Sequence, residues 1–423
     1  MRKTILIFHL LFFYIIQAQN DNSNYVMEYI NTSQGLPHDY VTSIISDDLN
    51  AKWIGTENGL TKYNGYNFDL IKPGKSYKKL KNENIEVLFK DDNNIIWIGT
   101  KSGGISSLDV RNNSITNYNH LIDKGKKGAI YIKAIASDGK GNIWIGTWED
   151  GVFVINPAKN ILVKHIKITS VINSIVKDNQ SNIWISYYKT VGKFNRNGEL
   201  LGNYNFNDNL SDLLFDSKRN KLWIGTSLTT TKLYFYDFET RKINFIETGV
   251  SSEFYKTLSL DSKNRLWIGT WLKGLYRSNT DLTKFSKIEL VSPDSGKLKI
   301  NYNTILKVHH DKHNQVWVAT ANGGVVKLIE SKGFKNASEL LDPKSLNEDL
   351  NFGAIYKGKT TLFVGTLNNG IYSGTNFTDL KLIKEVGLTK VISLYEHQNK
   401  LFIGTKDNFY IYDLKLRLVF TCQ

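Results

Sequence analysis

The sequence predicts an all-β fold built from repeated units of four short strands. A phrase close to Trp-Ile-Gly-Thr recurs along the 423-residue chain at intervals of 39 to 50 residues. An alternating apolar run and a turn rich in Asp and Asn come before most copies, and no unit shows the 3.6-residue period of a helix. Strand repeats of this length predict the blades of a β-propeller, because ankyrin and tetratricopeptide repeats are shorter and helical.

Nine copies of the phrase align on one aromatic residue, which is Trp in the first seven units and Phe in the last two. These residues are Trp53, Trp97, Trp144, Trp184, Trp223, Trp267, Trp317, Phe363 and Phe402.

Each unit divides into four predicted strands. The first is an apolar run such as "VTSII" or "VINSIV", and a turn such as "DGKGN" or "DNQSN" suits the hairpin that follows it. The repeated phrase is the second strand, "GVFVIN" or "GLYRSN" the third, and "NILVKHI" or "KINFIE" the fourth. Because a blade packs between two neighbours, we expect the Trp to fill one interface, the Ile to fill the other and the Gly to allow close backbone approach.

The turn residues divide the chain. Units one to seven carry a predicted turn Asp, whereas units eight and nine have "KGKT" and "HQNK" in its place. The predicted turn aspartates are Asp48, Asp92, Asp138, Asp178, Asp216, Asp261 and Asp311. The N-terminal run "NYVMEYIN" lacks a partner of its own, and it is predicted to complete the seventh blade, which would hide sheet edges.

We therefore predict a seven-bladed propeller over residues 19–332, a linker over 333–350, and two blades of an incomplete second propeller over 351–423. A single ring of eight or nine blades is the alternative.

The N-terminus predicts export. Arg2 and Lys3 precede an apolar run from Ile5 to Ile16, and a cleavage point follows at Ala18, so residues 1–18 form a predicted signal peptide. An uncleaved anchor is the alternative, but the apolar run is short for a membrane span of about 20 residues. We expect a periplasmic or secreted protein without a membrane span after signal cleavage.

Composition excludes other classes. A lone Cys422 allows no intramolecular disulfide. The net charge of +14 comes from lysines that are scattered rather than gathered in one run, which indicates a solvated surface and no nucleic-acid partner.

The segment "SQGLPHDYVTSIISDDLNAKWIGTENGLTKYNGYNFDLI", Ser33 to Ile71, resembles the opening blade of the two-component regulator propellers. This family forms the periplasmic sensor half of hybrid histidine kinases. The resemblance implies a sensor of an extracellular ligand, often an oligosaccharide. Family members usually carry two propellers, a β-sandwich, a membrane helix and a kinase, whereas this chain ends at "LRLVFTCQ" in unit nine. The resemblance therefore implies a truncated sensor, or a protein that works through a membrane histidine kinase or as a homodimer.

No residue pattern argues for catalysis, a cofactor or a metal. His309, His310 and His313 cluster in the sequence, but no Cys or carboxylate set with suitable spacing accompanies them. A glycosidase needs two close carboxylates, and no such pair stands out. We expect a protein that is not an enzyme.

Two Trp residues are not needed for blade packing. Trp148 and Trp271 follow Gly-Thr in units three and six, on turns expected to open beside the central channel, and Tyr187 and Tyr188 occupy the equivalent place in unit four. Exposed rings suit the flat faces of sugars, and nearby Glu149, Asp150 and Lys273 could bind hydroxyls. Four further tyrosines are expected on the same rim: Tyr40, Tyr131, Tyr255 and Tyr302.

The predicted function is ligand sensing at this rim, with an oligosaccharide or another small extracellular ligand as partner. The simpler interpretation is that the rings only plug the channel. A secreted scaffold that binds a partner protein is the alternative function.

Overall fold

The computed structural model describes residues 25–74, 80–123, 130–227, 230–252, 254–290, 302–330, 352–358, 360–375, 379–387 and 390–422. The predicted signal peptide and the predicted linker lie outside these residues. The chain divides into two compact units, Met1–Glu330 and Ser331–Gln423. The predicted all-β propeller class is confirmed, and the two units are described separately.

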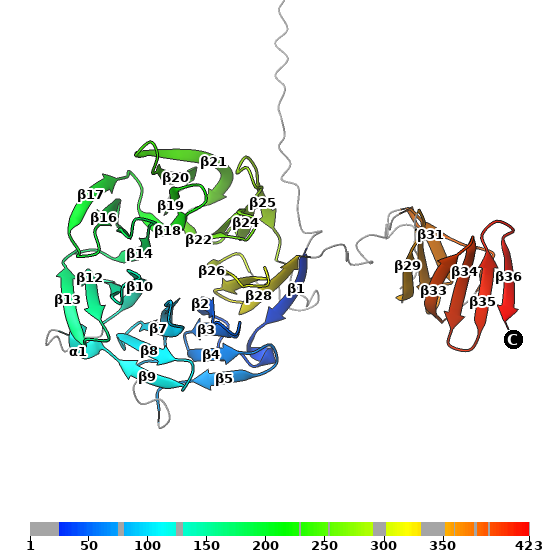
Figure 1. Ribbon diagram of the computed structural model, residues 1–423, viewed down its shortest axis with the longest axis horizontal. Coiled ribbons are helices and arrows are strands. Elements are labelled where there is room, and N and C mark those ends of the chain that lie inside the picture. The colour runs from blue at the N-terminus through cyan, green and yellow to red at the C-terminus, as the bar shows by residue number, and fades with distance from the viewer. Residues whose placement is uncertain are drawn as a thin grey trace, which may run out of the picture. The chain divides into compact units, whose positions relative to one another are not determined.

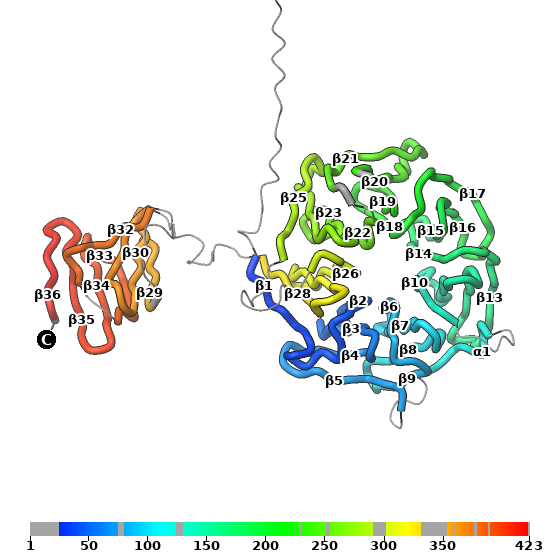
Figure 2. Tube along the Cα trace, turned by 180° about the vertical axis from the view of Figure 1, so that it is seen from behind, coloured from blue at the N-terminus to red at the C-terminus, as the bar shows by residue number. Residues whose placement is uncertain are grey.

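Among the described residues of the first unit, seven four-stranded antiparallel sheets surround a central axis (Figures 1 and 2). One strand of each sheet faces the axis, and these inner strands contact one another in sequence order until the last contacts the first. The inner strands are β2 (Val41–Ser46), β6 (Ile85–Lys90), β10 (Ile132–Ser137), β14 (Ile172–Lys177), β18 (Leu210–Asp216), β22 (Tyr255–Leu260) and β26 (Ile305–His310).

The remaining strands of each sheet follow outward in order. The second strands, which carry the repeated phrase, are β3 (Lys52–Thr56), β7 (Ile95–Thr100), β11 (Ile143–Thr147), β15 (Ile183–Tyr187), β19 (Lys221–Thr226), β23 (Leu266–Thr270) and β27 (Val316–Thr320). The third are β4 (Gly59–Tyr63), β8 (Ile105–Asp109), β12 (Val152–Asn156), β16 (Thr190–Phe194), β20 (Thr230–Asp237), β24 (Leu275–Ser278) and β28 (Val325–Glu330). The outer strands of the first six sheets are β5 (Phe68–Ile71), β9 (Ser114–Asn117), β13 (Ile161–Ile166), β17 (Leu200–Asn205), β21 (Lys242–Ser252) and β25 (Phe285–Ile288).

The seventh sheet combines both ends of the first unit. Its outer strand is β1 (Tyr25–Ile30), which pairs antiparallel with β28, so that Tyr25 faces Glu330 and Ile30 faces Val325 (Figure 1). A 3-10 turn, η2 (Thr32–Gln34), follows β1, and a short helix, α1 (Asn119–Ile122), follows β9. The N-terminal strand therefore covers an edge of β28 that would otherwise be exposed.

The second unit contains two four-stranded sheets among its described residues. The first comprises β29 (Phe352–Lys357), β30 (Leu362–Thr366), β31 (Ile371–Gly374) and β32 (Lys381–Leu382). The second comprises β33 (Val391–His397), β34 (Lys400–Thr405), β35 (Phe409–Asp413) and β36 (Leu418–Cys422). An apolar cluster that includes Phe363, Val391 and Leu401 joins the two sheets.

The repeated Trp holds the hairpin turn that precedes it. All seven Trp side chains are at most 3% exposed, and in six sheets the indole N–H donates to a turn carboxylate at 2.8 to 3.3 Å. The donor and acceptor pairs are Trp53–Asp47, Trp97–Asp91, Trp184–Asp178, Trp223–Asp216, Trp267–Asp261 and Trp317–Asp311. The second oxygen of Asp178 accepts the backbone N–H groups of Gln180 and Asn182, so one carboxylate orders both the turn and the indole.

The predicted turn residues Asp48 and Asp92 lie in their turns, but they are not the residues that accept the indole N–H. The acceptors are Asp47 and Asp91, which lie six residues before their Trp, as Asp178 does in the fourth sheet. The side chain of Asp48 instead pairs with Lys90 at 2.7 Å.

The third sheet departs from this pattern. The buried Nε1 of Trp144 has no acceptor among the described residues, and the amide of Asn142 binds Asp138 at 2.7 Å instead. Phe363 and Phe402, in the units without a turn Asp, carry no indole N–H that needs an acceptor.

The Gly and Thr of the phrase have separate roles. A Cβ added to Gly146 would lie 2.5 Å from Ile172 at the start of the next inner strand, so the Gly admits the neighbouring sheet. The Thr147 hydroxyl donates to the carbonyl of Gly151 at 2.9 Å and closes the turn before the third strand. The phrase therefore recurs because every sheet needs the same turn, interface and hairpin.

Candidate functional site

A ring of side chains lines the axis of the first unit. Each inner strand has a register shift after its first residue, and such a bulge re-aims the side chain that follows. The second residues of the seven inner strands are Thr42, Glu86, Lys133, Asn173, Ser211, Lys256 and Leu306. Six of the seven are polar, although a fully or almost fully buried residue precedes each of them in its strand.

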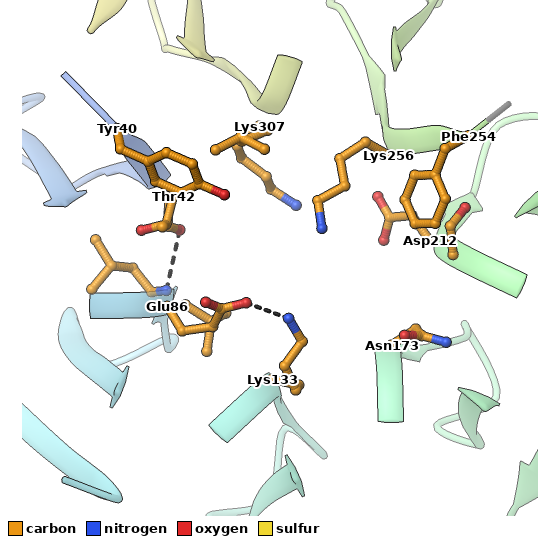
Figure 3. Close-up of a pocket in the computed structure, with 14 residues that line it drawn as sticks. Tyr40, Thr42, Glu86, Lys133, Asn173, Asp212, Phe254, Lys256 and Lys307 are labelled. Carbon is orange, nitrogen blue, oxygen red and sulfur yellow. Dashed lines mark hydrogen bonds and ion pairs between the residues drawn. The ribbon is translucent and has the colours of Figure 1, made fainter. Parts of the chain in front are cut away.

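These residues line a cavity of about 150 Å³ on the axis (Figure 3). All seven inner strands contribute to it, and Tyr40 and Phe254, the residues just before β2 and β22, complete its wall. The shift in β18 spans two residues, so Asp212 joins Ser211 in the lining. Figure 3 shows Lys256 and Lys307 extending toward one another from adjacent sheets.

The charged groups on one side of the cavity form a connected network. Lys133 forms an ion pair with Glu86, and the two side chains are 13% and 14% exposed. Burial and the neighbouring Glu86 carboxylate raise the pKa of Tyr131 far above its ordinary value. Glu86 therefore links the lysine that lines the cavity to a tyrosine on the rim.

Trp148 is the exposed end of that network. Its ring stacks on Tyr131 with a centroid distance of 5.2 Å and an interplanar angle of 1°, and its backbone N–H donates to the Tyr131 carbonyl at 3.0 Å. The Lys133 ammonium lies 5.6 Å from the Trp148 ring and 5.1 Å from the Tyr131 ring. Trp148 remains 43% exposed, so part of its ring is open to solvent beside the cavity.

Trp271 has an equivalent position in the sixth sheet. Its backbone N–H donates to the carbonyl of Phe254, which lines the cavity, and its side chain is 39% exposed. The third and sixth sheets are three places apart in the ring, so Trp148 and Trp271 lie on widely separated parts of one rim (Figure 1).

The other predicted site residues are spread more widely. Tyr188 is 59% exposed, whereas Tyr187 is half-buried and donates to Asn203 at 3.2 Å. Lys273 is exposed in the turn after Trp271. Glu149 and Asp150 line a different cavity of about 350 Å³, together with His165 of β13, and not the cavity on the axis.

Two of the four tyrosines expected on the rim are wrong. Tyr255 is fully buried, with its hydroxyl donating to the Val250 carbonyl at 2.8 Å, and Tyr302 is 3% exposed in the core between the last two sheets. Tyr255 is the first residue of β22 and points into the core, so the residue before it, Phe254, reaches the cavity.

The predicted histidine cluster does not converge. His309 hydrogen bonds to Ser46 at 2.7 Å, while the ring of His310 packs edge-on against Trp267. Burial lowers the pKa of His309 to about 3 and that of His310 to about 4. Within the residues that the structure describes, no three His, Cys, Asp or Glu side chains come together as a metal site. No helix of the described part is long and apolar enough to cross a membrane.

The fold and the cavity define the class: the first unit is a β-propeller with a polar site on its axis. Residues 126–149 match a family model described as two component regulator propeller. This match confirms the resemblance found in the sequence, and the chain carries the repeat of the two-component regulator propeller family. No relative was found among curated protein sequences.

Solved structures share the fold. The extracellular domain of the hybrid two-component system BT3049 of B. thetaiotaomicron is 18% identical with a TM-score of 0.63, and the match covers 94% of this chain and 54% of that one. The extracellular domain of the one-component system BT4673 of the same organism is 20% identical with a TM-score of 0.57, covering 95% and 54%. The chain thus spans about half the length of these domains. Virginiamycin B lyase of Staphylococcus aureus is 13% identical with a TM-score of 0.54, covering 73% and 100%.

Proposed function

We propose that this protein is an extracytoplasmic ligand-sensing propeller of a two-component signalling system and that it binds an oligosaccharide at the mouth of its axial cavity. The observation that carries the proposal is the arrangement of Trp148, Tyr131 and Lys133, in which an exposed ring stands directly beside a cavity lined with polar groups. A sugar ring stacked on Trp148 could place its hydroxyls against the polar ring of inner-strand residues.

Trp271 would supply a second stacking surface, and Tyr188 a third. Tyr187 and Lys273 would contribute polar groups at the same rim. Glu149 lies on a neighbouring cavity, so it would contact only a ligand long enough to extend beyond Trp148. We propose that the protein acts without catalysis and passes its signal through a membrane histidine kinase or a second copy of itself.

The test is a binding screen of the whole chain against neutral and acidic oligosaccharides, with hydrolysis followed on the same samples. Trp148→Ala and Trp271→Ala should each weaken binding by about tenfold or more, as expected for loss of one stacking contact. Their Tm values should stay within about 2 °C of the parent. Tyr66→Ala is the matched control, because Tyr66 is 90% exposed in an outer turn. No binding by any oligosaccharide, or a large loss of Tm in both Trp variants, would refute the proposal.

A second candidate function is a scaffold that binds a partner protein, and the last sheet of the second unit favours it. Tyr395, Phe402, Ile411 and Phe420 pair directly across β33 to β36 and form one apolar row. Tyr395 is 56% and Phe420 49% exposed. In the first unit the Trp at the position of Phe402 packs against the next sheet, as Trp53 does in a cluster with residues of β6 and β7.

An uncovered row of this kind would bury against another β-sheet. Phe420→Asp, in the middle of an outer strand, should abolish any partner complex without changing oligosaccharide binding by the first unit. Sedimentation of the parent and of the variant would separate the two candidate functions.

A further inference from the structure

Two lysines in the axial cavity have no acidic partner. Lys133 is paired with Glu86, but neither Lys256 nor Lys307 forms an ion pair or a side-chain hydrogen bond within the described residues. The Lys256 ammonium lies 5.5 Å from the Phe254 ring. Figure 3 shows Lys307 directed from the next sheet toward the Lys256 ammonium.

The other carboxylate in the lining of the cavity, that of Asp212, is already engaged in hydrogen bonds. One oxygen of Asp212 accepts from the Ser174 hydroxyl at 2.9 Å and from the backbone N–H of Leu213 at 3.0 Å. The other oxygen accepts from the backbone N–H of Leu258 at 3.0 Å. Asp212 therefore ties neighbouring inner strands together, and within the described residues it forms no ion pair with a lysine.

The electrostatics of this pair favour an anion. Burial chiefly lowers the pKa of Lys256, and the charges of Lys133 and Lys307 lower it further, while Glu86 and Asp212 act in the opposite direction. Two half-buried cations that face the same small cavity repel each other, and a negative group placed between them removes that cost.

We infer that the cavity binds an anionic group between Lys256 and Lys307, and that the ligand is a saccharide bearing a carboxylate or a sulfate. This inference rests on the proposed function, since it names the chemical class of the sensed oligosaccharide. The charged group would enter the axis while the sugar ring stays at the rim. Tyr40 and Phe254 would flank it, and the neutral hydroxyls would contact Asn173 and Thr42.

The first experiment uses simple anions on the whole chain. Sodium sulfate and sodium acetate are compared with sodium chloride at matched ionic strength, and the change in Tm is measured for the parent, Lys256→Gln, Lys307→Gln and the control Lys159→Gln. Lys159 is exposed in the turn before β13, outside the cavity. We expect sulfate or acetate to stabilise the parent and the control more than chloride does, and both cavity variants to lose that excess.

Without added anion, the cavity variants should be as stable as the parent or slightly more stable, because a repulsive charge is removed. A loss of stability in both would mean that the lysines are structural, and equal stabilisation of all four proteins by sulfate and acetate would mean that no anion site exists. Either outcome overturns the inference.

The second experiment separates the sources of the charge and the two proposals. Short uronate oligomers, sulfated disaccharides and neutral oligomers of equal length are titrated calorimetrically. Binding of one acidic class with at least about tenfold loss in Lys256→Gln is expected, since one charge-assisted contact is removed. Preferred binding of neutral oligomers, unchanged in both variants, would overturn the anion inference and leave the proposed function intact. Sulfate stabilisation without binding of any saccharide would overturn the proposed function and the saccharide part of the inference, and it would leave only an anion site between the two lysines.

Discussion

Replacing single repeated Trp residues by Phe tests the account of the Trp–Asp pair. Trp53 and Trp144 are both fully buried, and both lie in clusters made mainly of aliphatic side chains. They differ at the indole nitrogen. The N–H of Trp53 donates to Asp47 at 3.0 Å, whereas that of Trp144 has no acceptor within the described chain.

The two substitutions remove the same apolar atoms, so their cavity costs should be similar. Trp53→Phe also breaks a hydrogen bond to a carboxylate, which is worth about 1.5–3 kcal/mol, and it leaves an oxygen of the nearly buried Asp47 without that donor. Trp144→Phe removes a buried N–H that is already unpaired, and this gain offsets part of the destabilisation caused by the cavity. We expect Trp53→Phe to lower the free energy of unfolding by about 2 kcal/mol more than Trp144→Phe.

The assay is urea unfolding of the whole chain followed by far-UV circular dichroism, with both variants compared with the parent. The second unit is identical in all three proteins, so its contribution cancels in the difference. Equal losses in the two variants, or a greater loss in Trp144→Phe, would refute the role assigned to the indole–carboxylate hydrogen bond.

Two further predictions concern acid and the glycine of the phrase. His309 and His310 are neutral when folded, because burial lowers their pKa values to about 3 and about 4, and they titrate near 6.5 when unfolded. Below pH 6.5 the unfolded state therefore binds more protons than the folded state does. The contribution of each His to the free energy of unfolding is fully present above that pH, and it decreases by up to about 2 kcal/mol at pH 5. In a His309→Gln/His310→Gln variant, the free energy of unfolding should depend less on pH. Urea titrations at pH 5 and 7.5 measure this dependence, and the same difference between the two pH values in the variant and in the parent would contradict the prediction. Gly146→Ala should lower stability by about 1–3 kcal/mol, because its Cβ would lie 2.5 Å from Ile172, while Gly202→Ala, whose nearest neighbour would lie at 4.0 Å, should be close to neutral in the same measurement.

The repeated elements could be predicted from the sequence because each repeated residue has the same task in every sheet. Trp184 binds Asp178 six positions earlier, and Thr147 closes its turn onto Gly151 four positions later, so the spacing between residues carries the geometry. The acceptor of the indole N–H is ambiguous in the sequence where two adjacent Asp residues offer the same chemistry. Asp47 and Asp48 cannot be told apart by residue type, and only the constant distance to Trp53 separates them.

The cavity could not be predicted in the same way, because its residues do not repeat. A bulge after the first residue of each inner strand decides which side chain faces the axis, and side chains in a strand alternate between faces. If the start of β22 is placed one residue too late, the buried Tyr255 is assigned to the rim in place of Phe254, which lines the cavity. A usable signal was present: a polar residue directly follows the first apolar residue in six of the seven inner strands.

The residues that build the ring are separate from the residues that line its axis. Trp267, Gly269 and Thr270 act within the sheet interface and the hairpin, so changing them would damage the ring itself. The side chain of Lys256 lies at a bulge, outside the regular pairing of β22 with β23, and it faces the axis instead of a neighbouring sheet. Substitution at such a position should alter the charge of the cavity at little cost to packing. The chemistry of the ligand therefore has to be inferred from the residues that differ between the sheets, and among these Lys256 and Lys307 are the cavity lysines that no ion pair engages within the described residues.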